Sequence, residues 1–227
     1  IGLNAFEDLL TTGGSYIDIV KIGFGTSVLY SRDLLQKKIT MAKSRNITII
    51  PGGTFLELAV HKNKVDPWFD MVCHLGFNGI EVSDGTIEMD RALRNKLIQK
   101  GIDHNLEVFT EYGKKLSGKI SHIGKLIETV NEDIRSGAKL VTIEGRESGK
   151  NAGLYDQNGS CDHDEINAIM ERVSVTERMM WETPLKAQQI DFLKKLGPNA
   201  NLGNIAPKDV MSLEALRRGL RSDTFPS

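Results

Sequence analysis

The chain has 227 residues, of which 40% are apolar, so it is long enough for a sizeable hydrophobic core in one domain. Its 29 basic and 30 acidic residues nearly cancel, so it lacks the basic surface that a nucleic-acid partner requires. No apolar stretch has the roughly 18 to 20 residues that span a bilayer, and the first residues do not form a secretory signal. Cys73 and Cys161 are far apart and belong to no metal-binding motif. We therefore expect a protein of the reducing cytoplasm, without a nucleic-acid or membrane partner.

Short β-branched runs alternate with amphipathic segments along the chain, a pattern typical of consecutive parallel βα units. Seven strands are predicted, over residues 16–22, 46–51, 79–83, 107–111, 139–144, 178–182 and 200–205. Two of the intervening helices are expected to end at Gly101 and Gly137, because glycine readily adopts the left-handed conformation that closes a helix. The last helix is expected to start near Pro207.

Seven βα units without a linker or a break in composition indicate an α/β fold. We expect a single domain over residues 1–227, a (β/α)8 barrel of the TIM type. Such a barrel has eight strands, so the predicted count is one strand short. The chain opens on a helix-like segment, so we expect the first strand to lie upstream of Ile1 or to be missing from the chain. An open doubly wound sheet would also accommodate seven strands. It more often carries a glycine-rich dinucleotide turn after the first strand, so the barrel is favoured.

The functional face of such a barrel is formed by the carboxyl ends of its strands. Four apolar runs end in charged clusters there, in the motifs IEVSDG, VFTEYGKK, LVTIEGRES and MMWETP. Because an unpartnered buried charge costs roughly several kcal/mol, repeated charges at strand ends predict a shared site. The polar residues that this placement collects are Lys21, Gly52, Gly53, Ser83, Asp84, Glu111, Lys114, Lys115, Glu144, Arg146, Glu147, Glu182 and Asn204.

Carboxylates are the most frequent charged groups in this set. Their oxygens are the ligands that Mg²⁺ prefers, although the same carboxylates could equally neutralise nearby basic residues. The carboxylates concerned are Asp84, Glu111, Glu144 and Glu182. The five histidines fall mostly in helical or loop patterns, so a zinc site is not expected.

The basic residues suggest acid–base or anion-binding chemistry. A lysine at a barrel mouth, here Lys21 or Lys115, can serve as a general acid or a Schiff-base nucleophile, and the alternative is a solvated charge. The guanidinium of Arg146 suits phosphate or carboxylate oxygens, and the alternative is a surface loop held by an Arg/Glu pair. Glycine motifs such as GGT at 52–54 could offer backbone N–H groups to an anion, but they more often mark tight turns.

Several segments together resemble the phosphosulfolactate synthase family. They are DIVKIGFGTS, PGGTFLE, GIEVSDGTI, EYGKK, EGRESGKNAGLYDQNG, QQIDFLKKLGPNANLGNI and LRRGLRSDTF, and the similarity extends through nearly the whole chain. The resemblance implies a (β/α)8 barrel that adds sulfite to phosphoenolpyruvate, with Mg²⁺, to give phosphosulfolactate. In the family a further strand precedes the part that begins here, in agreement with the missing first strand.

The resemblance also suggests roles for individual residues. It implies Lys115, the second lysine of EYGKK, as the general acid. The other catalytic candidates are Lys21 and Arg146, for phosphate and sulfite contacts, and Glu111. The candidate metal ligands are Glu144, Glu182 and Asp84. The candidate substrate-binding residues are Lys114, Gly52, Gly53, Ser83 and Asn204.

Other functions remain open at this point. A non-catalytic relative of the heat-stress-associated type would share the same motifs. A Schiff-base aldolase would use Lys21 or Lys115 as its amine, and a sugar-phosphate isomerase is a more distant alternative. We also expect a homo-oligomer. The sequence does not distinguish a pathway that ends at sulfolactate from one that makes a sulfonated coenzyme such as coenzyme M.

Overall fold

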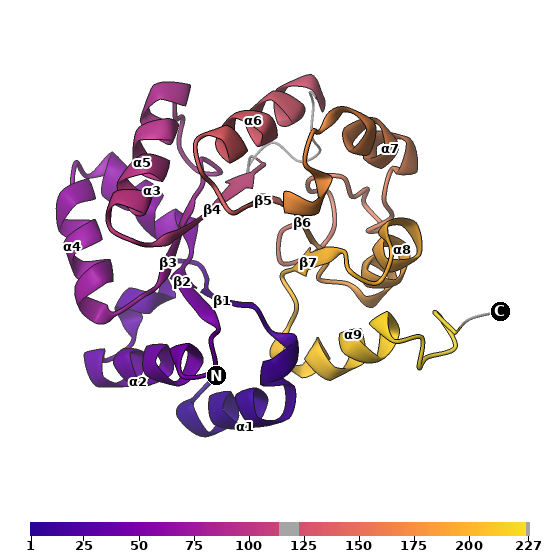
Figure 1. Cartoon of the computed structure of the whole chain (residues 1–227), viewed down its shortest axis with the longest axis horizontal. Helices are drawn as coiled ribbons and strands as arrows, with labels where there is room; N and C mark the ends of the chain where they lie inside the picture. The colour runs from indigo at the N-terminus through magenta and orange to yellow at the C-terminus, as the bar shows by residue number, and fades with distance from the viewer. Residues whose placement is uncertain (114–122, 226–227) are drawn as a thin grey trace. The chain divides into compact units, whose positions relative to one another are not determined.

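A computed structural model describes residues 1–113 and 123–225 (Figure 1). The strands are β1 (Ile19–Ile22), β2 (Thr48–Pro51), β3 (Gly79–Val82), β4 (Glu107–Tyr112), β5 (Leu140–Ile143), β6 (Met179–Glu182) and β7 (Asn201–Gly203). The helices are α1 (Leu3–Gly13), α2 (Arg32–Lys43), α3 (Gly53–His61), α4 (Val65–Leu75), α5 (Arg91–Asp103), α6 (Ile123–Arg135), α7 (His163–Arg172), α8 (Lys186–Leu196) and α9 (Val210–Arg217). All seven predicted strands are present, with bounds that differ by a few residues.

The chain divides into two compact units. Unit 1 comprises Ile1–Glu111 and Arg135–Lys139, and unit 2 comprises Tyr112–Ile134 and Leu140–Ser227, as far as these residues are described. The prediction of one domain over residues 1–227 stays a prediction. Among the described residues, no helix combines the length and the apolar character that crossing a bilayer would require.

Unit 1 contains two pairs of parallel strands. β1 pairs with β2 so that Lys21 lies opposite Ile50, and β3 pairs with β4 in the same parallel sense. The side-chain oxygen of Asn78, just before β3, accepts a hydrogen bond from the amide of Ile49 at 2.8 Å, which links β2 to the start of β3. Parallel pairing brings the carboxyl ends of the paired strands to the same edge.

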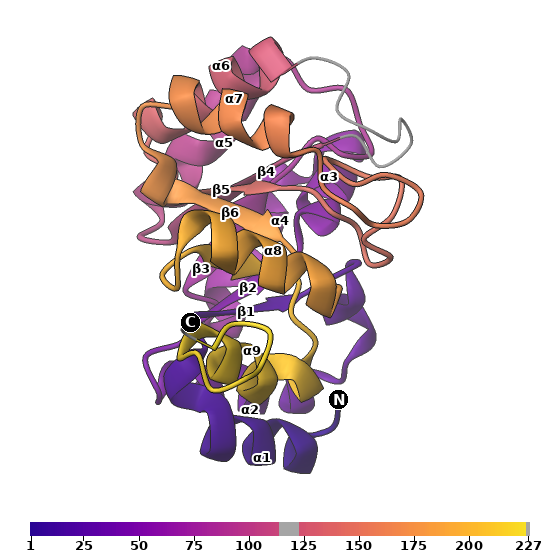
Figure 2. The same ribbon diagram turned by 90° about the vertical axis from the view of Figure 1, so that its right-hand side faces the viewer.

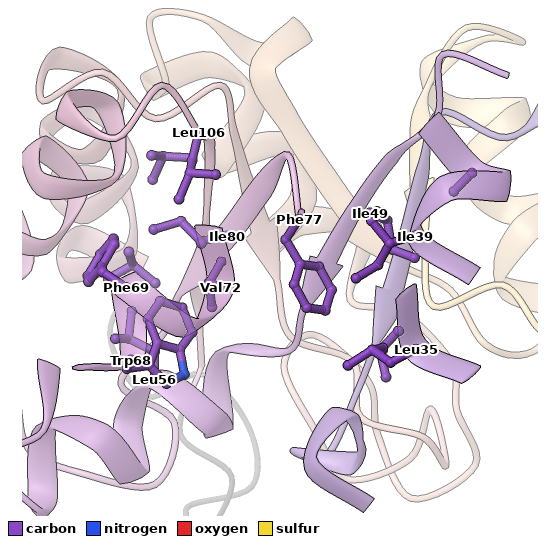
Figure 3. Packing of buried hydrophobic residues seen from close by; sticks show 14 of the residues in the cluster. Leu35, Ile39, Ile49, Leu56, Trp68, Phe69, Val72, Phe77, Ile80 and Leu106 are labelled. Atoms are coloured by element: carbon purple, nitrogen blue, oxygen red, sulfur yellow. The ribbon is translucent and has the colours of Figure 1, made fainter. Parts of the chain in front are cut away.

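The core of unit 1 lies between these strands and their helices. Figure 3 shows Ile39 of α2 beside Ile49 of β2, and Phe69 of α4 near Ile80 of β3. All four side chains are buried. Burial of each such side chain contributes roughly 1.5 to 3 kcal/mol, so this packing holds the strand ends in place.

The prediction that a helix ends at Gly101 is wrong, because α5 continues to Asp103. A Cβ atom at position 101 would lie 2.6 Å from Cγ2 of Val108 and 2.7 Å from Cδ1 of Ile80. Gly101 therefore allows α5 to approach β3 and β4 closely. The prediction for Gly137 is confirmed, since α6 ends at Arg135 and Gly137 has a φ of 105°.

Unit 2 contains three adjacent parallel strands. Ile143 of β5 lies opposite Trp181 of β6, and Glu182 lies opposite Gly203 of β7. Figure 2 shows α7 and α8 beside β5 and β6. The rings of Trp181 and Phe192 of α8 have centroids 5.0 Å apart, and both residues belong to the buried core of this unit. The start of α9 follows a short 3₁₀ turn at Pro207–Asp209, close to the predicted helix start.

Candidate active site

Unit 1 holds an ammonium group between two buried carboxylates. Nζ of Lys21 donates to Oε1 of Glu81 at 2.9 Å and to Oε2 of Glu111 at 2.8 Å. The Lys21 side chain is 33% exposed, whereas those of Glu81 and Glu111 are 2% and 3% exposed. The structure thus brings two predicted catalytic residues together, on β1 and β4, around a third charged residue on β3.

Glu81 has a perturbed pKa. Burial raises the pKa of Glu81 to about 7, the charge of Lys21 opposes this rise, and the charge of Glu111 adds to it. The amide of Gly53, which donates to Oε2 of Glu81 at 2.8 Å, also favours the charged form. The pKa of Glu81 therefore lies close to neutral pH.

A buried arginine connects the ends of β3 and β4. Nη1 of Arg94, on α5, is 3.3 Å from Oδ1 of Asp84, and Nη2 donates to the backbone carbonyl of Glu111 at 3.0 Å. This arrangement fixes the loop after β3 against the strand end that carries Glu111. Because Asp84 pairs with Arg94, its carboxylate already neutralises a buried charge, and its role as a metal ligand stays a prediction.

Glu57 organises the loop that follows β3. This buried carboxylate on α3 accepts a hydrogen bond from the Ser83 hydroxyl, and also from the amides of Gly85 at 3.2 Å and Thr86 at 2.7 Å. Ser83 and Gly53, two predicted substrate contacts, thus both donate to glutamates of the protein. Gly52 precedes α3, as expected for a glycine at a helix start, and its amide donates to the carbonyl of Ile22 at 2.9 Å.

Unit 2 presents two carboxylates at the ends of adjacent strands. The amide of Gly145 donates to Oε2 of Glu182 at 2.9 Å, and the next amide, that of Arg146, donates to Oε1 of Glu144 at 2.6 Å. Both glutamates are buried. Hydrogen bonds from backbone amides fix the orientation of a carboxylate. Consecutive amides therefore orient both predicted metal ligands.

Arg146 and Asn204 adopt an uncommon backbone conformation. Their φ angles are 57° and 56°, in the left-handed region, which costs a non-glycine residue about 1 to 2 kcal/mol. The side-chain amide of Asn204 donates to the carbonyl of Arg146 at 2.9 Å and lies 3.4 Å from Oε2 of Glu182. The structure thus brings together four predicted site residues of unit 2, namely Glu144, Arg146, Glu182 and Asn204.

The loop between β5 and α7 is anchored by two buried side chains. Nε2 of Gln188, on α8, donates to the carbonyls of Gly149 at 2.7 Å and Gly159 at 3.0 Å. The hydroxyl of Tyr155 donates to the carbonyl of Glu182 at 2.5 Å. Burial raises the pKa of Tyr155 above its usual range, so the hydroxyl remains a donor. The loop that carries Arg146 therefore has a defined path.

The donor chemistry in unit 2 fits Mg²⁺. Among the described residues, no group of three or more His, Cys, Asp or Glu side chains is arranged to hold a metal ion. Mg²⁺ typically needs one or two protein carboxylates, however, and completes its coordination with water and substrate phosphates. Glu144 and Glu182 supply carboxylates of that kind.

Sequence reasoning missed three buried charged residues around the strand ends of unit 1, namely Glu57, Glu81 and Arg94. Glu81 interrupts the apolar run of β3 in the same way that Lys21 interrupts that of β1, so this signal could have identified it. Glu57 and Arg94 lie on amphipathic helices, where a charged residue normally indicates the solvent-facing side. Lys114 and Lys115 lie outside the described residues, so the prediction that they contact substrate or donate a proton remains untested.

Parallel βα units with paired and hydrogen-bonded charged side chains at their strand ends are typical of α/β-barrel enzymes. A family model described as (2R)-phospho-3-sulfolactate synthase (ComA) matches residues 1–223. The chain belongs to this family of enzymes, as its sequence motifs predict.

Relatives with known names agree with this assignment. The phosphosulfolactate synthase of Methanocaldococcus jannaschii is 42% identical over 221 residues, which is 96% of this chain and 88% of the relative. That of Methanothermobacter thermautotrophicus is 38% identical over 227 residues, 99% of this chain and 88% of the relative. That of Bacillus subtilis is 36% identical over 225 residues, 98% of this chain and 88% of the relative.

Solved structures confirm the predicted fold class. The crystal structure of a 3-hexulose-6-phosphate synthase matches with a TM-score of 0.55 and 15% identity, over 93% of both chains. The dihydrodipicolinate synthase of Oceanobacillus iheyensis matches with a TM-score of 0.52 and 14% identity, over 98% of this chain and 68% of the other. At these identities the likeness concerns the fold alone, which is α/β with parallel strands and of the TIM-barrel type.

Proposed function

We propose that this protein adds sulfite to phosphoenolpyruvate and so produces phosphosulfolactate. The observation that carries the proposal is the similarity, over nearly the whole chain, to three proteins named phosphosulfolactate synthase. Each unit holds charged groups at its strand ends, and burying such groups costs free energy. A protein retains them more readily where they serve binding or catalysis, which favours an enzyme over a non-catalytic relative.

The proposed reaction forms one carbon–sulfur bond. The sulfur lone pair of sulfite attacks the terminal methylene carbon of phosphoenolpyruvate, and the electrons of the carbon–carbon double bond move to the neighbouring carbon. The adjacent carboxylate delocalises this charge until a proton is delivered to that carbon, while the phosphate ester stays intact. Both reactants are anions, so the site must supply positive charge to bring them together.

Basic side chains would supply this charge. Lys115 is the proposed general acid, which gives its proton to the carbon next to the carboxylate. Lys21 and Arg146 are the proposed contacts of the phosphate and sulfite oxygens. In other enzymes one preorganised donor contributes roughly 2.7 to 4 kcal/mol to transition-state stabilisation. Glu111 would act by holding the Lys21 ammonium, to which it is hydrogen-bonded.

We propose Glu144 and Glu182 as the residues that hold Mg²⁺. When bound, the ion would neutralise charge on the substrate carboxylate. Their orientation by the amides of Arg146 and Gly145 supports this assignment. Of the remaining proposed substrate contacts, Asn204 would act through Arg146 and Lys114 would act directly. Gly52 would shape the turn before α3, because its amide already donates to the carbonyl of Ile22.

A Schiff-base aldolase is less well supported. Such an enzyme needs an unprotonated lysine nitrogen that can attack a carbonyl carbon. Two N–H groups of Lys21 already donate to the carboxylates of Glu81 and Glu111. Treatment with borohydride and a carbonyl substrate, followed by peptide mass spectrometry, should leave Lys21 unmodified. A covalent adduct on Lys21 would favour the aldolase.

The direct test is an assay of the purified protein with sulfite, phosphoenolpyruvate and Mg²⁺. We expect the phosphosulfolactate adduct in mass spectrometry, with consumption of one sulfite per phosphoenolpyruvate and no release of inorganic phosphate. EDTA should stop the reaction and added Mg²⁺ should restore it. A folded protein that forms no sulfonated product under these conditions would instead indicate a non-catalytic relative. The predicted homo-oligomer and the cytoplasmic location stay predictions.

A further inference from the structure

Glu81 is a buried charge for which the proposed reaction has no direct use. It lies within β3, between Ile80 and Val82, and its side chain is almost fully buried. A buried ion cluster is often no more stabilising than an apolar side chain of similar volume. Core stability alone therefore does not explain a glutamate at this position.

The two carboxylate oxygens of Glu81 accept hydrogen bonds from two different groups. Oε1 accepts from Nζ of Lys21 at 2.9 Å, and Oε2 accepts from the amide of Gly53 at 2.8 Å. Glu111 accepts from the same Nζ at 2.8 Å, from a different strand. The Gly53 amide thus fixes the Glu81 carboxylate, which in turn restrains the Lys21 ammonium together with Glu111.

A lysine side chain has four flexible bonds, and an ammonium at its end samples many positions unless it is anchored. Two carboxylates from separate strands reduce this freedom before any substrate arrives. Preorganised charge is more effective in catalysis than charge that must reorient during the reaction.

We propose that Glu81 is a positioning residue, which acts with Glu111 to hold the Lys21 ammonium in one orientation toward an anionic substrate. This inference rests on the proposed function, in which Lys21 contacts the phosphate or the sulfite. Glu81 itself touches neither reactant. Its effect on catalysis passes through Lys21.

The test compares the wild type with Glu81→Gln, Lys21→Met and the double variant, with each substrate varied in turn. Glu81→Gln keeps the side-chain shape and removes the charge. We expect kcat/KM to fall on the order of 10- to 100-fold, as it does when partners that orient site residues are removed elsewhere. The decrease should be larger in the kcat/KM for one of the two substrates, and that substrate should be the one whose kcat/KM falls in Lys21→Met. The double variant should lose no more than Lys21→Met alone.

Glu107→Gln is the matched control. Glu107 lies on the neighbouring strand β4, but its carboxylate contacts Lys139 and Thr48. Activity of this variant should stay within about twofold of the wild type. The proposal is overturned if Glu81→Gln behaves like this control, or if the effects of Glu81→Gln and Lys21→Met multiply in the double variant. If Glu81→Gln does not fold, Glu81→Asp takes its place, because it keeps the charge but shortens the reach to Lys21.

A second readout does not depend on turnover. An anchored lysine ammonium exchanges its protons slowly and gives a ¹H–¹⁵N signal, which Lys21→Met would assign. Glu81→Gln should abolish that signal, and Glu107→Gln should preserve it. A wild type without synthase activity would refute the proposed function, whereas a Lys21 signal that persists in Glu81→Gln would refute the positioning role.

Discussion

The side-chain amide of Asn204 donates a hydrogen bond to the backbone carbonyl of Arg146, with 2.9 Å between the two atoms. Asn204 follows β7 and Arg146 follows β5, and both have left-handed backbone conformations. Asparagine tolerates this conformation better than most residues, because its short polar side chain can hydrogen-bond locally. One residue therefore provides both the turn after β7 and the support for the arginine.

Replacing Asn204 separates these two contributions. Asn204→Gly removes the hydrogen bond but tolerates a φ of 56°, whereas Asn204→Ala removes the bond and adds strain. Alanine should therefore destabilise the protein by about 1 kcal/mol more than glycine does, measured by urea unfolding. Both variants should lose activity to a similar extent, because both leave the carbonyl of Arg146 without this donor.

Asn46 offers a control for the Asn204 variants. It has a φ of 59° in an exposed turn before β2. Asn46→Gly and Asn46→Ala should differ in stability by a similar amount, because the strain is similar, but both should retain activity. If Asn204→Gly is as active as Asn46→Gly, the side chain of Asn204 does not support the site.

Gly101→Ala should destabilise the protein, although alanine in a helix is normally about 1 kcal/mol more favourable than glycine. The added Cβ would lie 2.6 Å from Val108 and force α5 away from β3 and β4. Overpacking of this kind costs about 1 to 3 kcal/mol. Gly124→Ala, on α6, is the matched control, because no atom of the described residues lies within 4 Å of its Cβ position. Denaturation midpoints should shift in opposite directions for the two variants, and equal shifts would contradict the packing argument.

The free energy of unfolding should depend on the protonation of Glu81. Its pKa rises from 4.5 to about 7 on folding, so between these values the folded state keeps a proton that the unfolded state has released. Stability from this group is fully present below about pH 4.5 and is lost as the pH rises through about 7, with a slope of at most about 1.4 kcal/mol per pH unit. Glu81→Gln cannot titrate. Urea unfolding of both proteins from pH 5 to pH 8 should show the wild type losing stability relative to the variant, and parallel curves would show that Glu81 does not titrate in this range.

Lys115→Ala should abolish turnover and leave the far-UV circular dichroism spectrum unchanged. A positioned general acid contributes about 10²- to 10⁴-fold, so kcat should fall by at least about 100-fold. Lys114→Ala, at the adjacent position, should raise KM and retain most of kcat, because a substrate contact is not a proton donor. Near-normal rates for Lys115→Ala would remove this lysine from the proposed role.

The charged residues show how far prediction from sequence extends. Lys21 stands out because it interrupts an apolar strand, and the structure confirms that it lies within a charged cluster with Glu111. Glu81 carries the same signal and was overlooked. The sequence gives no such indication for Arg94. A basic residue in an amphipathic helix normally faces solvent, so its position does not reveal that the side chain is buried against the end of a strand. Gly101 was misinterpreted for a related reason, since a glycine that ends a helix and one that admits a close neighbour look alike in sequence.

The amino-acid sequence by itself determined the order of the βα units, the seven strands, the family and most of the polar residues at the strand ends. These features depend on local periodicity and on residue types, which can be read from neighbouring positions. Only the tertiary structure decided which charges meet, such as Lys21 with Glu81 and Glu111, or Asn204 with Arg146. Such pairs join residues that are 58 to 90 positions apart in the chain, and their energies depend on burial and on distances of a few ångströms that only the folded chain establishes.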